Sequence, residues 1–192
     1  MRVICTGHRP PRLAGDYVVD GQPWQKTDQA VKSWHFFFTA LEGIKKQTTN
    51  LFAASGMAQG ADWLFCKACI GLKIPFKAFV PHPAFASKWP LQAQSEFGRL
   101  VADASEVRYT DQAWYLGIET KRDKQLVDWA KEERDSLLLA IWDRIPEGGS
   151  FFTIKRARNR NMNIWSLNPR TGVVTREPDE RQVAMPFDGD DD

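Results

Sequence analysis

The most apolar run of the chain, Ser136 to Trp142, is the sequence feature that most limits its fold. The run shows no polar alternation and stops at Asp143, which is typical of a strand that is buried on both faces. Such strands occur in parallel sheets with helices on both sides. The run therefore predicts a central strand of a parallel sheet.

Other short apolar runs alternate with segments of helical periodicity. Strands are expected at residues 2–6, 50–54, 76–80, 107–109 and 162–165, and helices at about 25–47, 61–72, 91–102, 120–133 and 147–159. Strands that alternate with helices indicate βαβ units. We therefore predict an α/β fold in a single domain: a Rossmann-like, doubly wound, mainly parallel sheet with flanking helices.

Residues 7–24, between the first strand and the first helix, are rich in proline and glycine. This density of chain breakers predicts a long irregular loop, and long loops in compact domains are often functional.

The predicted organisation is one domain over residues 1–166, an edge hairpin over residues 167–176, and an acidic tail over residues 177–192. The tail holds seven of the 24 acidic residues and one of the 26 basic ones, so the rest of the chain carries a formal charge of +8. Such tails are typically disordered and solubilising, while competition with nucleic acid and contact with a partner are the alternatives. A body of this charge would attract anions.

Two absences point to a cytoplasmic protein that does not associate with a membrane. No stretch approaches the roughly 20 apolar residues of a membrane span, and the N-terminus lacks the pattern of a secretory signal. The three cysteines, Cys5, Cys66 and Cys69, are too few for a disulfide framework. Cys66 and Cys69 are expected in the core of a helix, and we predict no metal and no cofactor.

Ligands of a doubly wound sheet bind outside the carboxyl ends of its strands. Three loops with unusual residues are expected at these ends, and we expect them to meet along one edge. They are Thr6-Gly7-His8-Arg9-Pro10, Ser55-Gly56-Met57-Ala58-Gln59-Gly60-Ala61-Asp62 and Glu147-Gly148-Gly149-Ser150.

The two glycine-bearing loops that precede helices predict binding of a phosphate or carboxylate. Glycine lets the backbone approach a ligand, and a helix N-terminus offers free N–H groups with partial positive charge. The simpler alternative is that the glycines only permit tight turns. Neither loop is a P-loop or a G-x-G-x-x-G fingerprint.

Charged residues of these loops have two interpretations each. Arg9 either grips a phosphate or is an ordinary surface residue, and His8 either contacts the ligand or caps a turn. Asp62 either caps its helix or binds a ribose hydroxyl. The pair Arg122-Asp123 is expected at the solvated start of a helix.

Eight tryptophans in a basic chain raise the alternative of single-stranded nucleic acid binding by stacking. Trp24, Trp89 and Trp114 fall in predicted loops. We expect them to cover the core rather than to bind bases.

These motifs resemble the SLOG superfamily, which includes Smf/DprA and LOG proteins, and within it the YpsA-like branch. The resemblance rests on the three loops, on Arg122-Asp123 with Val127-Asp128, and on Trp142-Asp143, and it covers about residues 1–166. It implies a Rossmann-like fold whose glycine loops bind nucleotides or nucleotide-derived molecules, often in a homo-oligomer.

The LOG-like phosphoribohydrolases of this superfamily use a glutamate that follows a Gly-Gly motif. This sequence departs from that pattern, because Lys155 stands where the glutamate is expected and Phe152 replaces a glycine. Without that carboxylate, no group is assigned to stabilise positive charge on the ribose or to activate water. We therefore assign no catalytic residue.

The predicted function is binding of a nucleotide or nucleotide-derived small molecule, as a sensor or regulatory module. The alternatives are hydrolysis of a nucleotide N-glycosidic bond and binding of single-stranded DNA, as in Smf/DprA-like proteins. The residues predicted to contact the ligand are Gly7, His8, Arg9, Ser55, Gly56, Gln59, Gly60, Asp62, Arg122, Asp128, Gly148, Gly149 and Ser150.

Overall fold

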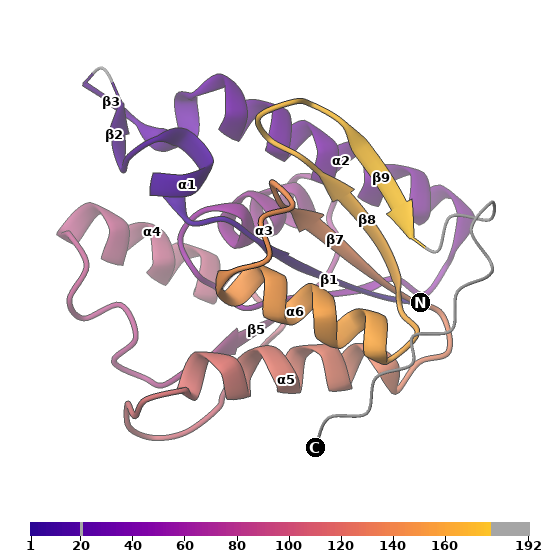
Figure 1. Cartoon of the computed structure of the whole chain (residues 1–192). Helices are drawn as coiled ribbons and strands as arrows, with labels where there is room; N and C mark the ends of the chain where they lie inside the picture. Colours follow the sequence, from indigo (N-terminus) through magenta and orange to yellow (C-terminus); the bar gives the residue numbers. More distant parts are fainter. Residues whose placement is uncertain (20, 178–192) are drawn as a thin grey trace.

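A computed structural model of the chain describes residues 1–19 and 21–177. Its main feature is one sheet with the strand order β6-β5-β4-β1-β7-β8-β9, covered by helices on both faces (Figure 1). The strands are β1 (Arg2–Gly7), β4 (Phe52–Ser55), β5 (Phe76–Val80), β6 (Glu106–Tyr109), β7 (Ser136–Ile141), β8 (Asn163–Leu167) and β9 (Val174–Glu177).

The long helices connect successive parallel strands. They are α2 (Asp28–Gln47), α3 (Ala61–Gly71), α4 (Leu91–Ala102), α5 (Ile118–Lys131) and α6 (Gly148–Asn159). β1 pairs in parallel with β4 on one side and with β7 on the other. The chain moves outward from β1 to β6 and then returns to start β7 beside β1, so the topological switch point lies between β1 and β7. The predicted fold is confirmed.

The strands β1 and β7 are buried on both faces, as their apolar runs predict. Leu137, Leu139 and Ile141 pack into the core under α2 and α3, whereas Leu138 and Ala140 pack into the core under α5 and α6. These two cores hold the helix N-termini at fixed positions over the carboxyl ends of the strands.

The prediction of an irregular loop over residues 7–24 is wrong. This segment contains the short helix α1 (Pro10–Ala14), the small hairpin of β2 (Val18–Val19) and β3 (Gln22–Pro23), and the start of a 3-10 turn, η1 (Trp24–Lys26). Pro10 and Pro11 are the first two residues of α1. At these positions proline favours a helix, because N–H groups there have no helical partner to lose.

At one edge, the sheet ends in an antiparallel hairpin of β8 and β9. Glu177, with which the predicted acidic tail begins, is the last residue of β9, and both its carboxylate oxygens accept hydrogen bonds from Arg158. The other residues of the predicted tail, 178–192, lie outside the described residues. Among the described helices, none is both long enough and apolar enough to cross a membrane.

Candidate functional site

A cavity of about 530 Å³ opens at the carboxyl ends of the strands, above the switch point. The loop after β1 and the starts of α3, α5 and α6 form its walls. The predicted ligand-binding residues that line it are Gly7, His8, Arg9, Asp62, Arg122, Gly148, Gly149 and Ser150. The predicted residues that do not line it are Ser55, Gly56, Gln59, Gly60 and Asp128.

The N-terminus of α6 is the strongest anion-binding feature of this cavity. The N-cap residue, Glu147, is extended and its side chain accepts no capping hydrogen bond. Gly149 and Ser150 therefore present the positive end of the helix with no side-chain cap, and both line the cavity. A phosphate oxygen is a natural acceptor for such N–H groups.

The N-terminus of α3 and the loop before it differ, because several of their N–H donors already have partners. The Ala61 N–H donates to the His8 carbonyl oxygen at 3.1 Å. The Ala58 N–H donates to Asp62 Oδ2 at 3.1 Å, and the Met57 N–H donates to Ser55 Oγ at 3.2 Å. The loop from Ser55 to Asp62 is thus bonded within itself and to the loop after β1.

The glycines of these two loops permit close packing between protein segments. A Cβ atom at Gly60, whose φ is +107°, would lie 2.3 Å from the His8 carbonyl oxygen. A Cβ at Gly7 would lie 2.5 Å from the Ala61 Cβ. Both contacts are far below van der Waals distance, so the two loops approach each other this closely only because both positions are glycine.

The expectation that Arg122 lies at a solvated helix start is wrong. Arg122 is only 5% exposed, and its Nη1 donates to the Gly56 carbonyl oxygen. Its Nε lies 2.7 Å from Asp123 Oδ1. Arg122 therefore joins α5 to the loop after β4 and places a buried positive charge in the cavity wall.

Two carboxyl groups, the buried Asp62 and the half-buried Asp123, lie near this arginine. Burial raises the pKa of Asp62 to about 6, although Arg122 and the Ala58 N–H act in the opposite direction. Burial also raises the pKa of Asp123, against the charge of Arg122. Both side chains line the cavity, where a carboxyl group can bond to a ribose hydroxyl or to an amino group of a base.

His8 faces Asp143 rather than the middle of the cavity. Its Nε2 lies 3.0 Å from the Asp143 backbone nitrogen, whose N–H donates to it, and 3.1 Å from Asp143 Oδ1. Burial lowers the pKa of His8, despite the nearby Asp143 carboxylate. We therefore assign His8 a neutral state in which it fixes the loop after β1 to the loop after β7.

Arg9 and Arg12 have different roles in the cavity wall. Arg12 donates to both oxygens of Asp143, at 2.9 and 3.0 Å, and its Nη1 lies 3.2 Å from Glu147 Oε1. These bonds from Arg12 hold the pKa of Asp143 below its usual range, although burial alone would raise it. Arg9 is exposed, and no carboxylate among the described residues lies within ion-pair distance of it. Arg9 is therefore the cation at this edge that is available to a ligand.

Seven cavity-lining residues with polar or aromatic side chains are not among the predicted ligand contacts: Thr6, Arg12, Glu119, Thr120, Asp123, Glu147 and Phe152. Glu119, Thr120 and Asp123 belong to the first turns of α5, which follows the edge strand β6 but contacts β1. No local signal in the sequence indicates this return to the centre of the sheet.

Asp128 lies further along α5, outside the cavity. Its carboxylate accepts hydrogen bonds from Arg156 at 3.0 Å and from Arg160 at 2.6 Å. These bonds join α5 to α6, so the described contacts of Asp128 are structural.

Two of the three loop tryptophans cover the core as predicted, and one does not. Trp24 is 3% exposed, and Trp89 packs on Trp63, Phe85 and Phe97. Trp114 is 62% exposed, so the prediction for this residue is wrong. Cys66 and Cys69 are buried in α3, as expected.

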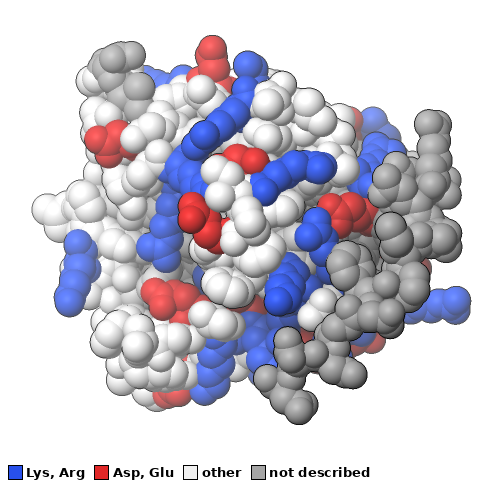
Figure 2. Space-filling view, viewed as in Figure 1, with Lys and Arg blue, Asp and Glu red and all other residues white. Residues whose placement is uncertain are grey.

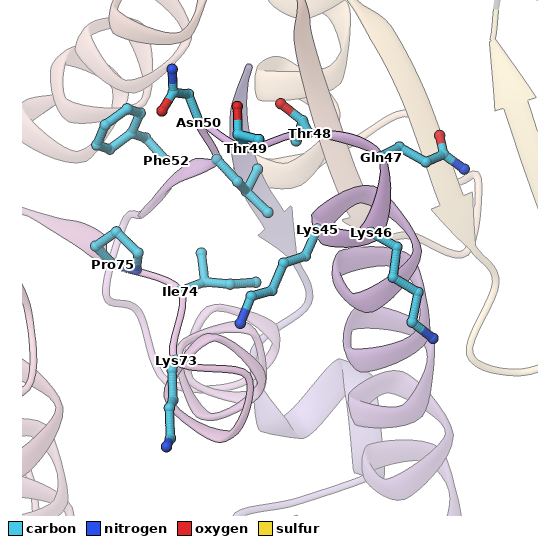
Figure 3. Close-up of a pocket in the computed structure, with 11 residues that line it drawn as sticks. Lys45, Lys46, Gln47, Thr48, Thr49, Asn50, Phe52, Lys73, Ile74 and Pro75 are labelled. Atoms are coloured by element: carbon cyan, nitrogen blue, oxygen red, sulfur yellow. The ribbon is translucent and has the colours of Figure 1, made fainter.

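A second cavity of about 560 Å³ lies at the opposite end of the sheet and contains three lysines (Figure 3). Lys45 donates to the Leu72 carbonyl oxygen at 2.5 Å, and Lys46, which points away from Lys45 and Lys73, pairs with Glu42. The C-terminal ends of α2 and α3 lie here, and helix C-termini carry partial negative charge. These lysines offset that charge. The first cavity, at the carboxyl ends of the strands, is therefore the better candidate for a ligand site, and we call it the sheet-edge cavity.

Comparisons with known proteins identify the fold. No protein-family model matches the sequence, and no curated protein matches it. Two solved structures are similar at 14% sequence identity: DNA processing protein A (DprA) from Streptococcus pneumoniae, with a TM-score of 0.59, and DprA from Helicobacter pylori, with a TM-score of 0.54. The likeness covers 87% and 88% of this chain.

The chain spans only part of these neighbours, 50% of the S. pneumoniae protein and 65% of the H. pylori protein. The H. pylori structure was described for its single-stranded DNA binding mode. At 14% identity the likeness establishes a shared Rossmann-like architecture. It agrees with the Smf/DprA side of the resemblance at the level of fold.

Proposed function

We propose that the sheet-edge cavity binds a phosphate-bearing nucleotide, either free or as one unit of single-stranded DNA. The observation that carries the proposal is the uncapped N-terminus of α6, which opens into a cavity of about 530 Å³ beside the free guanidinium of Arg9. The N–H groups of Gly149 and Ser150 would bind the phosphate, and Arg9 would add charge-assisted hydrogen bonds.

The carboxyl groups of the cavity suit the rest of a nucleotide. Asp62, Asp123 and Glu119 lie among its lining residues, and Asp123 Oδ2 lies 3.8 Å from the position of a Cβ at Gly149. Carboxylates accept hydrogen bonds from ribose hydroxyls and from amino groups of bases. A site that offers both donors and acceptors fits a nucleotide better than inorganic phosphate.

Of these two ligands, the comparisons favour single-stranded DNA, because the H. pylori neighbour binds it. A free nucleotide, as the YpsA-like resemblance implies, is the second candidate ligand. Basic and acidic side chains are interspersed over the face shown in Figure 2 rather than gathered into one basic stripe. We therefore propose that only a few phosphates are contacted.

The test compares labelled dT12 by fluorescence anisotropy with mono- and dinucleotides by calorimetry. Two variants target the site. Arg9→Ala removes the free cation, and Gly149→Asp adds a carboxylate at a helix N-terminus, where it is compatible with folding. Arg99→Ala and Gly98→Asp, both on the exposed side of α4, make the same charge changes away from the cavity.

We expect each site variant to weaken binding by about 1–3 kcal/mol, and both α4 controls to bind as the unchanged protein does. Binding of dT12 but not of mononucleotides would identify single-stranded DNA as the ligand, and the reverse would identify a free nucleotide. Equal affinity of Arg9→Ala and the unchanged protein would refute the assigned site.

Hydrolysis of the N-glycosidic bond is tested with the same ligands by chromatography for released base. Lys155, at the position of the LOG-type glutamate, is exposed and lines a different hollow with Arg156 and Asn159. No carboxylate of α6 therefore reaches the cavity, and we expect no released base.

A further inference from the structure

The loop between β6 and α5, residues 110–117, exposes three large apolar side chains. Trp114 is 62% exposed, Tyr115 37% and Leu116 90%. We call residues 110–117 the aromatic loop. Exposed apolar clusters of this kind mark interaction sites more often than isolated exposed residues do.

The aromatic loop is anchored at both ends. At its start, the Thr110 N–H donates to the Val80 carbonyl oxygen at 2.9 Å. At its end, the Ile118 N–H donates to the Tyr115 carbonyl oxygen at 3.2 Å. The Lys121 ammonium lies 5.6 Å from the centre of the Tyr115 ring. The loop thus presents Trp114 and Tyr115 from a fixed base.

The first turn of α5 connects the aromatic loop to the sheet-edge cavity. Glu119 and Thr120 line the cavity, while Lys121 contacts Tyr115. Figure 1 shows the N-termini of α5 and α6 at the same end of the molecule. Trp114 and Thr120 are six positions apart, so the chain between them spans at most about 20 Å when extended. A stacked strand advances about 3.4 Å per nucleotide, so up to about six nucleotides would bridge this distance.

We propose that Trp114, with Tyr115 beside it, is a stacking platform for bases of a single strand that continues out of the cavity. This proposal rests on the proposed function. Aromatic rings bind the faces of bases whatever their sequence, and Lys124, on an exposed position of α5 one turn from Lys121, suits a phosphate between stacked bases. The occupant is DNA rather than a protein partner because the patch adjoins a site with nucleotide chemistry.

Ligands of different length distinguish binding at the Trp114 platform from binding in the cavity. We would measure binding of dT12 and of dT1 5′-phosphate to the unchanged protein and to Trp114→Ala, Trp114→Phe and Leu91→Ala. Leu91 is 83% exposed at the start of α4 and controls for loss of an exposed apolar side chain. Light scattering of each variant reports its oligomeric state.

We expect Trp114→Ala to weaken dT12 binding about tenfold and to leave binding of the mononucleotide unchanged. Trp114→Phe keeps a ring and should retain most of the affinity, and Leu91→Ala should bind as the unchanged protein does.

Three results would overturn the platform. Unchanged dT12 affinity in Trp114→Ala, with loss in Arg9→Ala, removes the platform and keeps the cavity. A change of oligomeric state in Trp114→Ala, with DNA binding intact, makes the patch an interface between copies. If the unchanged protein binds neither ligand, the proposed function fails together with the platform.

Discussion

Arg122 lies directly over Gly56, and its Nη1 donates to the Gly56 carbonyl oxygen. The two residues are separated by 66 positions in the sequence, and their contact joins α5 to the loop after β4. A Cβ atom at position 56 would lie 2.3 Å from Nη1. The arginine can occupy this place only because residue 56 is glycine.

Gly56→Ala is therefore expected to destabilise the protein by about 2–4 kcal/mol, because it displaces a buried guanidinium from its partners. Urea unfolding followed by circular dichroism measures this change. Gly43→Ala is the matched control, since nothing lies within 4 Å of a Cβ at that position in α2. There alanine should stabilise by up to about 1 kcal/mol. A loss no larger than about 0.5 kcal/mol in Gly56→Ala would contradict the role of this contact.

Asp62 makes the stability depend on pH. Its folded-state pKa of about 6 lies above its ordinary value of 3.8, so the folded protein binds this proton more tightly than the unfolded chain does. The resulting stability is complete below pH 3.8 and is lost as the pH rises through 6. The loss is about 2 kcal/mol between pH 4 and pH 8.

Asp62→Asn removes this ionisation. The difference in unfolding free energy between Asp62→Asn and the unchanged protein should therefore shift by about 2 kcal/mol in favour of the variant between pH 4 and pH 8. Asp103→Asn, at an exposed position, serves as the control. A difference that is the same at both pH values would show that Asp62 does not retain its proton.

His8 is expected to remain neutral in mildly acidic solution, because burial lowers its pKa below 6.5. Since the unfolded chain binds this proton more readily, the contribution of His8 to stability is present above pH 6.5 and is lost as the pH falls through the lowered value. Nitrogen-15 NMR of the imidazole checks both the titration and the state of Nε2. Titration at or above pH 6.5 would contradict the neutral state assigned to His8.

Salt should weaken DNA binding only moderately. Basic side chains are not gathered into a stripe on the face of Figure 2, and the cavity offers Arg9 and the α6 N-terminus as its phosphate contacts. For two to four contacted phosphates, the logarithm of the binding constant should fall with the logarithm of salt concentration at a slope of about −1.4 to −2.8. Anisotropy titrations of dT12 over a range of salt concentrations measure this slope. A slope near zero would indicate that no phosphate is bound.

Local pattern was enough to predict most helices and strands and the edge at which the cavity lies. The run from Ser136 to Trp142 fills both cores because every residue after Ser136 is apolar, and Gly148 and Gly149 lie at the helix start where they are expected. These features depend on neighbours a few residues away, which the sequence displays directly.

The failures of the sequence-based interpretation concern side chains whose surroundings come from distant segments. The sequence predicts Arg122 at a solvated helix start and Trp114 as cover for the core, whereas Arg122 is buried and Trp114 is exposed. The return of α5 from the edge strand β6 to the centre of the sheet buries Arg122 and leaves Trp114 outside.

The sequence by itself thus determined the order of helices and strands, the parallel sheet and the loops that meet at its edge. The tertiary structure alone decided which of their side chains face the cavity and which glycines serve packing. Periodicity and turn residues act over a few positions, whereas a cavity wall forms from helices that are brought together by burial of apolar surface. The identity of a wall residue is therefore fixed only when these helices pack.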